Sequence, residues 1–222
     1  MARLNRLSKL SYDKLSRVII DGDYRPGETL NISKLAVKFH LNKTVVKEAL
    51  ARLESEGLVT WEHPSFHVTR LTPQQISDIY SARLLLEPEI AYIAASKIKD
   101  SQIRELERVF LKVKKQYELR SIDLIELTIL KEKFHTIIWH AMENEFLEDI
   151  LRKLYIKLRI MRMTALITWG RRERELIEHE KILLAIKERN GEAAKMAMKD
   201  HLKNLNDHVR EFVIPHLEAA YL

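Results

Sequence analysis

Hydrophobic and polar residues follow two different patterns along the chain, and the change comes near residue 72. Before it, short apolar stretches are separated by turn-forming residues such as Pro26-Gly27 and Gly57. After it, apolar residues recur at spacings of three and four over long stretches, which is typical of amphipathic helices. The pattern predicts a small domain over residues 1–72 and a larger helical domain over residues 73–222.

Residues 31–57 carry the pattern of two short helices joined by a tight turn. Asn31 and Asn42 are suited to begin these helices, because an asparagine side chain accepts a hydrogen bond from the first helical turn. Gly57 is placed to end the second helix. The apolar residues of that helix share one face: Val46, Ala49, Leu50 and Leu53.

Two short β-prone stretches, residues 58–61 and 66–69, come after the second helix, and residues 62–65 form the turn between them. A helix pair followed by a hairpin is a winged helix-turn-helix, whose second helix enters the DNA major groove. Outward lysines are also common on solvated helix faces, so the helix pair alone leaves both interpretations open. The residues placed to contact DNA are Lys34, Lys43, Thr44 and Lys47 on the helices, and His63 and Ser65 on the wing.

The larger domain contains stretches with helical periodicity and short connections. They cover residues 73–97, 100–119, 123–142, 145–169, 171–189 and 192–213. Thr72 is a suitable N-cap with Pro73 in the first turn, and Gly170 and Asn190-Gly191 are stop signals. Successive amphipathic helices with short connections form an antiparallel bundle. The predicted fold class is mainly α: an N-terminal winged helix-turn-helix and a C-terminal all-helical bundle of six or seven helices.

Composition and charge favour an acidic partner for the smaller domain. The 222 residues carry a net charge of +6, and residues 1–72 hold 12 Lys+Arg against 8 Asp+Glu, or +4 of that excess. A basic small domain suits the phosphates of DNA. The absence of cysteine excludes disulfides and thiolate metal sites. The sequence also lacks a signal peptide and an apolar stretch of the roughly 20 residues that span a bilayer, which predicts a cytoplasmic protein without membrane contact.

A gapless run from Gly27 to Val59 carries a family pattern. Its residues are Pro26-Gly27-Glu28, Leu30, Leu35-Ala36, Lys43-Thr44, Val46-Lys47-Glu48-Ala49-Leu50 and Arg52-Leu53-Glu54-Ser55-Glu56-Gly57-Leu58-Val59. With its flanks it resembles the DNA-binding domain of the GntR family of bacterial transcription regulators, which implies binding to a double-stranded DNA operator. Ser33, Lys43 and Lys47 stand where the family usually has arginines. Lysine cannot make the two-pronged contact of arginine with guanine, so the operator of relatives does not carry over.

Three later segments carry histidines: Phe134-His135, Glu178-His179-Glu180-Lys181-Ile182 and Met198-Lys199-Asp200-His201-Leu202. With residues 79–88 they resemble the FCD effector-binding bundle of the FadR-type subgroup. The resemblance implies that His135, His179 and His201 bind a divalent metal, that a small organic or sugar acid docks on it, and that the bundle forms a homodimer. Neutral imidazoles suit zinc or nickel, and three from three helices can converge inside a bundle. His179 and His201 lie at equal distances from the turn at Asn190, so an antiparallel pair brings them to one level.

Lys131 stands one turn before His135, where the family has an aspartate ligand. Three interpretations follow. The histidines bind metal with water or Glu132 completing the site, or Lys131 replaces the metal's charge and holds an acidic effector directly. In the third, the histidines are hydrogen-bonded core residues. Arg83 has two similar alternatives, an effector carboxylate or an ion pair with Glu87 one turn later.

These features predict a ligand-responsive regulator that is not an enzyme, with Arg83 and Lys131 as effector contacts and zinc or nickel as the metal. The alternative from another class is a metal-dependent hydrolase that uses the three histidines with an open coordination position. No carboxylate of the sequence is clearly placed as the general base of such an enzyme, and the winged helix-turn-helix would have no role in it.

Overall fold

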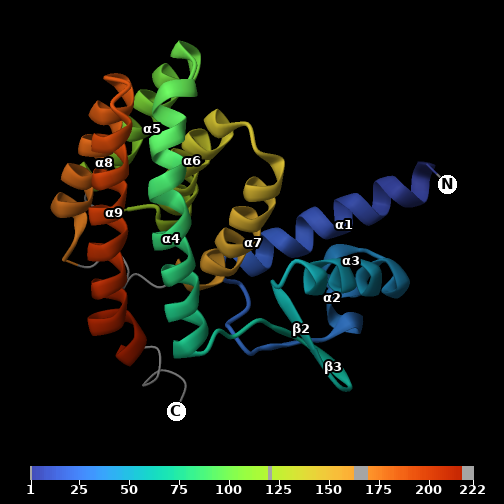
Figure 1. Ribbon diagram of the computed structural model, residues 1–222. Coiled ribbons are helices and arrows are strands. Elements are labelled where there is room, and N and C mark those ends of the chain that lie inside the picture. Colours follow the sequence, from blue (N-terminus) through green and yellow to red (C-terminus); the bar gives the residue numbers. More distant parts are fainter. Residues whose placement is uncertain (1, 120–121, 163–169, 217–222) are drawn as a thin grey trace. The chain divides into compact units, whose positions relative to one another are not determined.

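The computed structural model describes residues 2–119, 122–162 and 170–216 of the 222-residue chain (Figure 1). Its contacts divide the chain into two compact units. The first holds the chain up to Leu71 together with a stretch that begins at Lys153, and the second holds the remainder from Thr72. The division after Leu71 lies one residue before the predicted boundary, whereas the grouping of Lys153 and its successors with the first unit was not predicted.

The first unit is a winged helix-turn-helix, which confirms the prediction for this part of the chain. Its elements are α1 (Ala2–Ile20), β1 (Thr29–Leu30), α2 (Ile32–Phe39), α3 (Lys43–Ser55), β2 (Val59–Glu62) and β3 (Ser65–Val68). The strands form an antiparallel sheet in the order β1-β3-β2. Figure 1 shows β2 and β3 projecting as a long hairpin from the helices.

Both short helices begin at the predicted asparagine caps. The Asn31 side chain accepts a hydrogen bond from the Lys34 amide at 3.0 Å, and the Asn42 side chain accepts one from the Thr44 amide at 2.8 Å. His40 ends α2 in the left-handed conformation at φ 54°. Glycine is usual in that conformation, and another residue there costs about 1–2 kcal/mol. The tight turn of the motif therefore forms without glycine.

The hairpin differs by one residue from its predicted bounds. Glu62 pairs with Ser65, so that both belong to strands and His63-Pro64 alone makes the turn. Strand β1, which pairs with β3, was not predicted because two residues are too few to carry a periodic pattern. The apolar residues of both helices and the sheet form one core, which includes Leu35, Val46, Leu50, Leu53, Val59, Phe66 and Val68.

The second unit is an all-helical bundle, as predicted. Its helices are α4 (Pro73–Lys97), α5 (Asp100–Glu118), α6 (Leu124–Met142), α8 (Arg172–Lys187) and α9 (Gly191–His208), and η2 (Val209–Val213) is a π-helix that follows α9 directly. Helix α7 (Glu145–Arg162) begins in this unit, and its residues from Lys153 onward group with the first unit. The helix predicted over residues 145–169 is observed to Arg162, and residues 163–169 lie outside the described residues. Neighbouring helices pack in the pairs α4 with α9, α4 with α6, α5 with α6 and α8 with α9 (Figure 1).

Helix α4 is the central element of the bundle because it packs against both α9 and α6. It starts with a capping box in which Thr72 and Gln75 exchange hydrogen bonds. The helix continues through Pro88, which is buried. None of the described helices combines the length and the apolar character that crossing a membrane requires.

Candidate functional site

Three buried histidines from three different helices meet inside the bundle. His135 lies on α6, His179 on α8 and His201 on α9, and their candidate ligand atoms all lie within 4.8 Å of one another. The ring centroids of His179 and His201 are 4.5 Å apart, and that of His135 is 5.6 and 5.4 Å from them. The expected convergence, including the common level of His179 and His201, is present in the structure.

Each of these rings places Nδ1 against an oxygen acceptor. His179 Nδ1 forms a hydrogen bond with the Glu175 carbonyl oxygen at 2.9 Å, and His201 Nδ1 forms one with Glu178 Oε2 at 2.9 Å. His135 Nδ1 lies 2.8 Å from Glu87 Oε2 but lacks the geometry of a hydrogen bond. Within the described part of the chain, Nε2 of His179 and Nε2 of His201 are buried and have no hydrogen-bond partner. Acceptors of this kind hold metal-binding imidazoles in metalloproteins, because they fix the ring and leave the other nitrogen for the ion.

The protonation of the rings also suits a metal. Burial lowers the pKa of both His179 and His201 well below the ordinary value, and a neighbouring histidine lowers it further in each case. Both rings are therefore neutral at pH 7 and keep a lone pair on one nitrogen. A metal ion needs this neutral form, since a protonated imidazole has no lone pair to donate.

Three ion pairs surround the histidines. They are Arg83 Nε with Glu87 Oε1 at 2.6 Å, Lys131 Nζ with Glu175 Oε1 at 2.6 Å, and Arg171 Nη2 with Glu178 Oε2 at 2.7 Å. Burial alone would raise the pKa of Glu87 and of Glu175, but the cation beside each lowers it below the ordinary value. For Glu178 burial outweighs the effect of Arg171, and its pKa is raised.

Lys131, the residue in place of the family's aspartate, has a carboxylate partner that the sequence did not reveal. Its side chain is 12% exposed and lies against Glu175, which also accepts a hydrogen bond from the Tyr117 hydroxyl at 2.8 Å. Glu175 precedes His179 by one helical turn, and this spacing was the one available signal for it. The ammonium beside the histidines is therefore balanced by a carboxylate.

Arg83 is fully buried, and the ion pair with Glu87 expected as one of its two alternatives is present. Contact of Arg83 with an effector stays a prediction. Glu132 is absent from the group of clustered ligand-type residues, which among the described residues consists of the three histidines. No sequence pattern indicated Glu178 as the acceptor for His201, because that contact joins two helices.

The residues predicted to contact DNA lie on the surface of the first unit. Lys34, Lys43, Thr44, Lys47 and His63 are exposed, and Ser65 is half-buried. The opposite face of α3 is buried in the core, so Lys43 and Lys47 are held one turn apart at the outer side of its first turns. This arrangement suits contacts with phosphates on neighbouring nucleotides, which stay a prediction.

Both units match known protein families. Residues 7–65 match the family described as "Bacterial regulatory proteins, gntR family", and residues 78–204 match the FCD domain. The chain is 30% identical over 217 residues to the HTH-type transcriptional regulator LutR of Bacillus subtilis, covering 86% of this chain and 95% of that protein. It is 24% identical over 213 residues to the gluconate operon transcriptional repressor of the same organism, covering 91% of this chain and 84% of that protein.

Among solved structures, Escherichia coli McbR/YncC has the same fold, with a TM-score of 0.78 and 20% identity over 92% of this chain and 98% of that chain. These relatives are regulators, and none of the comparisons supports the hydrolase considered as an alternative. The chain belongs to the GntR family in its FCD-containing form, and it is a DNA-binding transcription regulator rather than an enzyme.

Proposed function

We propose that this protein is a homodimeric repressor. Its affinity for its operator is controlled by a small carboxylate that binds in the bundle beside a divalent metal. The observation that carries the proposal is the cluster of His135, His179 and His201, whose candidate ligand atoms lie within 4.8 Å of one another. Two of these buried rings have an Nε2 without a hydrogen-bond partner among the described residues, and a metal ion would satisfy both.

The residues fit zinc or nickel, the borderline metals that imidazole nitrogens prefer. When bound, such an ion supplies a Lewis-acidic position for an oxygen ligand of the effector. The chain's own residues orient the site: the Glu175 carbonyl and the Glu178 carboxylate accept from Nδ1 of His179 and His201, and the Glu87 carboxylate lies 2.8 Å from Nδ1 of His135. Lys131 is held by Glu175, so this pair occupies the place from which the family's aspartate would reach the ion.

The charges around the histidines favour an anionic effector. Three cations, Arg83, Lys131 and Arg171, already match the three carboxylates to which they are paired. A divalent ion therefore brings two positive charges into a buried region where the described ion pairs leave no surplus carboxylate to neutralise them. An organic or sugar acid supplies that negative charge. The name of the gluconate operon repressor, whose operon serves a sugar acid, agrees with this class.

The test is operator binding in the presence of candidate acids. Fluorescence anisotropy with DNA from the upstream region of the protein's own gene measures affinity for the metal-loaded and the chelator-treated protein. We expect at least one organic or sugar acid to weaken DNA binding tenfold or more in the loaded protein and to have little effect after chelation. Acids that act equally on both preparations would remove the metal from the proposal, and failure to bind any upstream DNA would contradict the operator function.

A further inference from the structure

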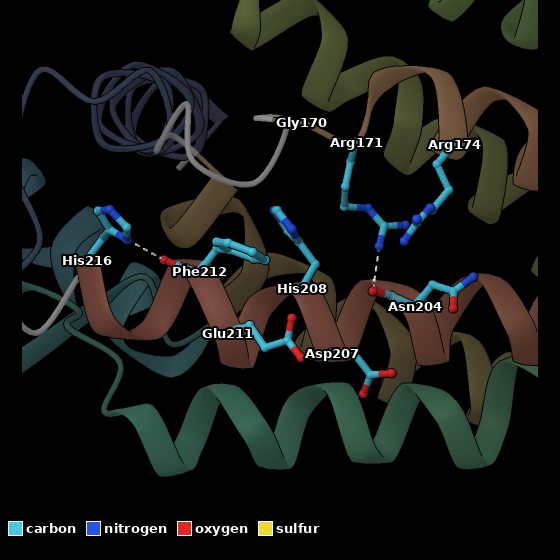
Figure 2. A pocket seen from close by; sticks show the side chains of 9 residues that line it. All are labelled: Gly170, Arg171, Arg174, Asn204, Asp207, His208, Glu211, Phe212 and His216. Carbon is cyan, nitrogen blue, oxygen red and sulfur yellow. Dashed lines mark hydrogen bonds between the residues drawn. The ribbon is translucent and has the colours of Figure 1, made fainter.

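A pocket separate from the histidine cluster lies in the bundle, between the start of α8 and the region where α9 passes into η2 (Figure 2). Its volume is about 830 Å³, within the range of small-molecule pockets. Arg171 and Arg174 line it from the α8 side, and Asn204, Asp207, Glu211 and Phe212 line it from α9 and η2. None of the three clustered histidines lines this pocket.

The pocket has a basic wall on the α8 side and an acidic wall on the side of α9 and η2, where His208 and His216 also line it. Figure 2 shows the side chains of Arg171 and Arg174 extending from α8 toward α9, while Asp207 and Glu211 follow one another along the opposite helix. Asp207 and Glu211 are four residues apart and therefore lie on one helical face. Arg174, Asp207 and Glu211 are exposed, and no ion pair joins any of them to another residue in the described ranges.

Arg171 is fixed at this pocket by two hydrogen bonds. Its side chain is 4% exposed, Nη2 donates to Glu178 Oε2 at 2.7 Å, and Nη1 donates to the carbonyl oxygen of Asn204. Its Nε is buried and has no acceptor among the residues that the structure describes. Arg171 is therefore held in place by its Nη1 and Nη2 bonds, and Arg174 supplies the exposed guanidinium of the pocket.

We propose that this pocket binds a small zwitterion, an α-amino acid or a short peptide. The ligand carboxylate lies toward Arg171 and Arg174, the ammonium lies toward Asp207 and Glu211, and an apolar side chain packs on Phe212, which is 52% exposed. A simple anion would be repelled by the acidic wall and a simple cation by the basic wall. A molecule with both charges is attracted by both walls.

The pocket is connected to the histidine site through Arg171. Glu178 accepts from Arg171 on one side and holds Nδ1 of His201 on the other. A carboxylate on Arg171 shares the guanidinium with Glu178 and so alters the acceptor that orients His201. The zwitterion and a metal bound by the histidines are therefore expected to change each other's affinity, and by the same factor.

The experiment is calorimetric titration of the chelator-treated full chain with the twenty protein amino acids, each also as its N-acetyl form and its amide. Acetylation removes the ammonium charge, and amidation removes the carboxylate charge. The ligand that we propose is the α-amino acid itself, and we expect at least one free amino acid to bind with a Kd of about 1 mM or tighter. Both capped forms of that amino acid should bind at least tenfold more weakly.

Variants locate the site. Asp207→Asn combined with Glu211→Gln should reduce the preference for the free over the acetylated form below twofold, and Arg174→Gln should do the same for the free form over the amide. All three substituted residues are exposed, so the fold should be retained. Lys199→Gln, at an exposed lysine of α9 that does not line the pocket, should leave both preferences unchanged.

Absence of binding by every free amino acid would overturn the proposal, as would equal binding of the capped forms or loss of the preferences in Lys199→Gln. The measurement involves neither DNA nor metal. Its failure therefore leaves the proposed control of operator binding by a metal-bound acid intact, and failure of that control leaves this pocket intact.

Discussion

Lys131 Nζ lies 2.6 Å from Glu175 Oε1 in the interior of the bundle, next to the three clustered histidines. The sequence showed only half of this pair, a lysine where relatives have a metal-binding aspartate. An unbalanced ammonium would repel a metal strongly, but the carboxylate beside it cancels most of the charge at a distance. Compared with the aspartate that the family resemblance implies, the proposed metal site therefore lacks mainly a ligand, and Lys131 adds little net charge to it.

Replacing Lys131 by an acid should strengthen metal binding. Lys131→Asp removes a cation and adds a carboxylate beside the histidines, and one charge at about 4–6 Å contributes roughly 3–4 kcal/mol per unit of metal charge at an effective dielectric near 20. Since Glu175 screens part of this, we expect a gain of about tenfold or more in affinity for zinc or nickel. Competition titration after chelator treatment measures it.

Lys133 offers the matched control for that experiment. It lies on the same helix, and its Nζ is also 2.6 Å from a glutamate oxygen, that of Glu105, but its side chain is 49% exposed. Lys133→Asp should leave metal affinity unchanged within a factor of two. Equal affinities for the unaltered protein and the Lys131→Asp protein would show that position 131 does not act on the metal.

The buried pair Arg83–Glu87 should be costly to break. Both side chains are 0% exposed, so Arg83→Met leaves the Glu87 carboxylate buried beside the His135 ring without its guanidinium partner. We expect the free energy of unfolding to fall by about 3–5 kcal/mol, the usual cost of leaving one partner of a buried pair. Urea denaturation followed by circular dichroism measures the change.

The exposed pair of Arg152 and Asp149 is the control, with side chains 66% and 61% exposed. Arg152→Met should cost less than about 1 kcal/mol, as for most surface ion pairs. The double substitution Arg83→Met with Glu87→Leu should be less destabilising than Arg83→Met alone, because it removes both charges of this pair and leaves neither of them buried without its partner. If the double protein is the less stable one, packing rather than charge explains the loss.

The helices and the histidine cluster could be predicted from the sequence because they depend on residues that are close together along the chain. Asn31 and Asn42 act through their own first turn, and the common level of His179 and His201 follows from counting residues on either side of one turn. Such features need only the helical period and the position of a connection. The fold class and the convergence of the three histidines were therefore predictable from the order of the residues.

The partners of these histidines could not be predicted from the sequence. Glu87 reaches His135 from α4, and Glu178 reaches His201 from α8, so both contacts depend on how far neighbouring helices are rotated about their axes. A rotation of about 100°, which separates adjacent residues on a helix, would exchange one partner for another.

Metal should stabilise the folded protein through the histidine cluster. A ligand that binds only the native state at a hundred times its Kd adds about 2.7 kcal/mol to the free energy of unfolding, so zinc should raise the melting temperature of the unaltered protein. His201→Ala should abolish most of this rise. His140→Ala is the control, because the His140 side chain is 55% exposed and pairs with Glu148 outside the cluster. Identical zinc responses of the two variants would place the ion elsewhere.

The protein should be a homodimer at micromolar concentration. Symmetric dimers are the commonest oligomers, and a winged helix-turn-helix dimer reads two half-sites of a palindromic operator. Sedimentation velocity of the full chain should give about twice the mass of 26.2 kDa. A fragment from residue 73 onward should also sediment as a dimer, with about twice its own mass. A full chain that remains monomeric at these concentrations would contradict the prediction.

Removal of one lysine from the recognition helix should weaken DNA binding in a manner that reveals its role. Lys47 is exposed near the start of α3, where it is placed to neutralise a phosphate. Lys47→Ala should lower operator affinity and reduce the slope of log affinity against log salt by about one, because one fewer counterion is released. Lys112→Ala, at an exposed lysine of α5 in the bundle, is the control and should change neither quantity. A Lys47→Ala protein with a lower affinity but an unchanged slope would indicate a contact with a base, and one with both unchanged would place Lys47 outside the interface.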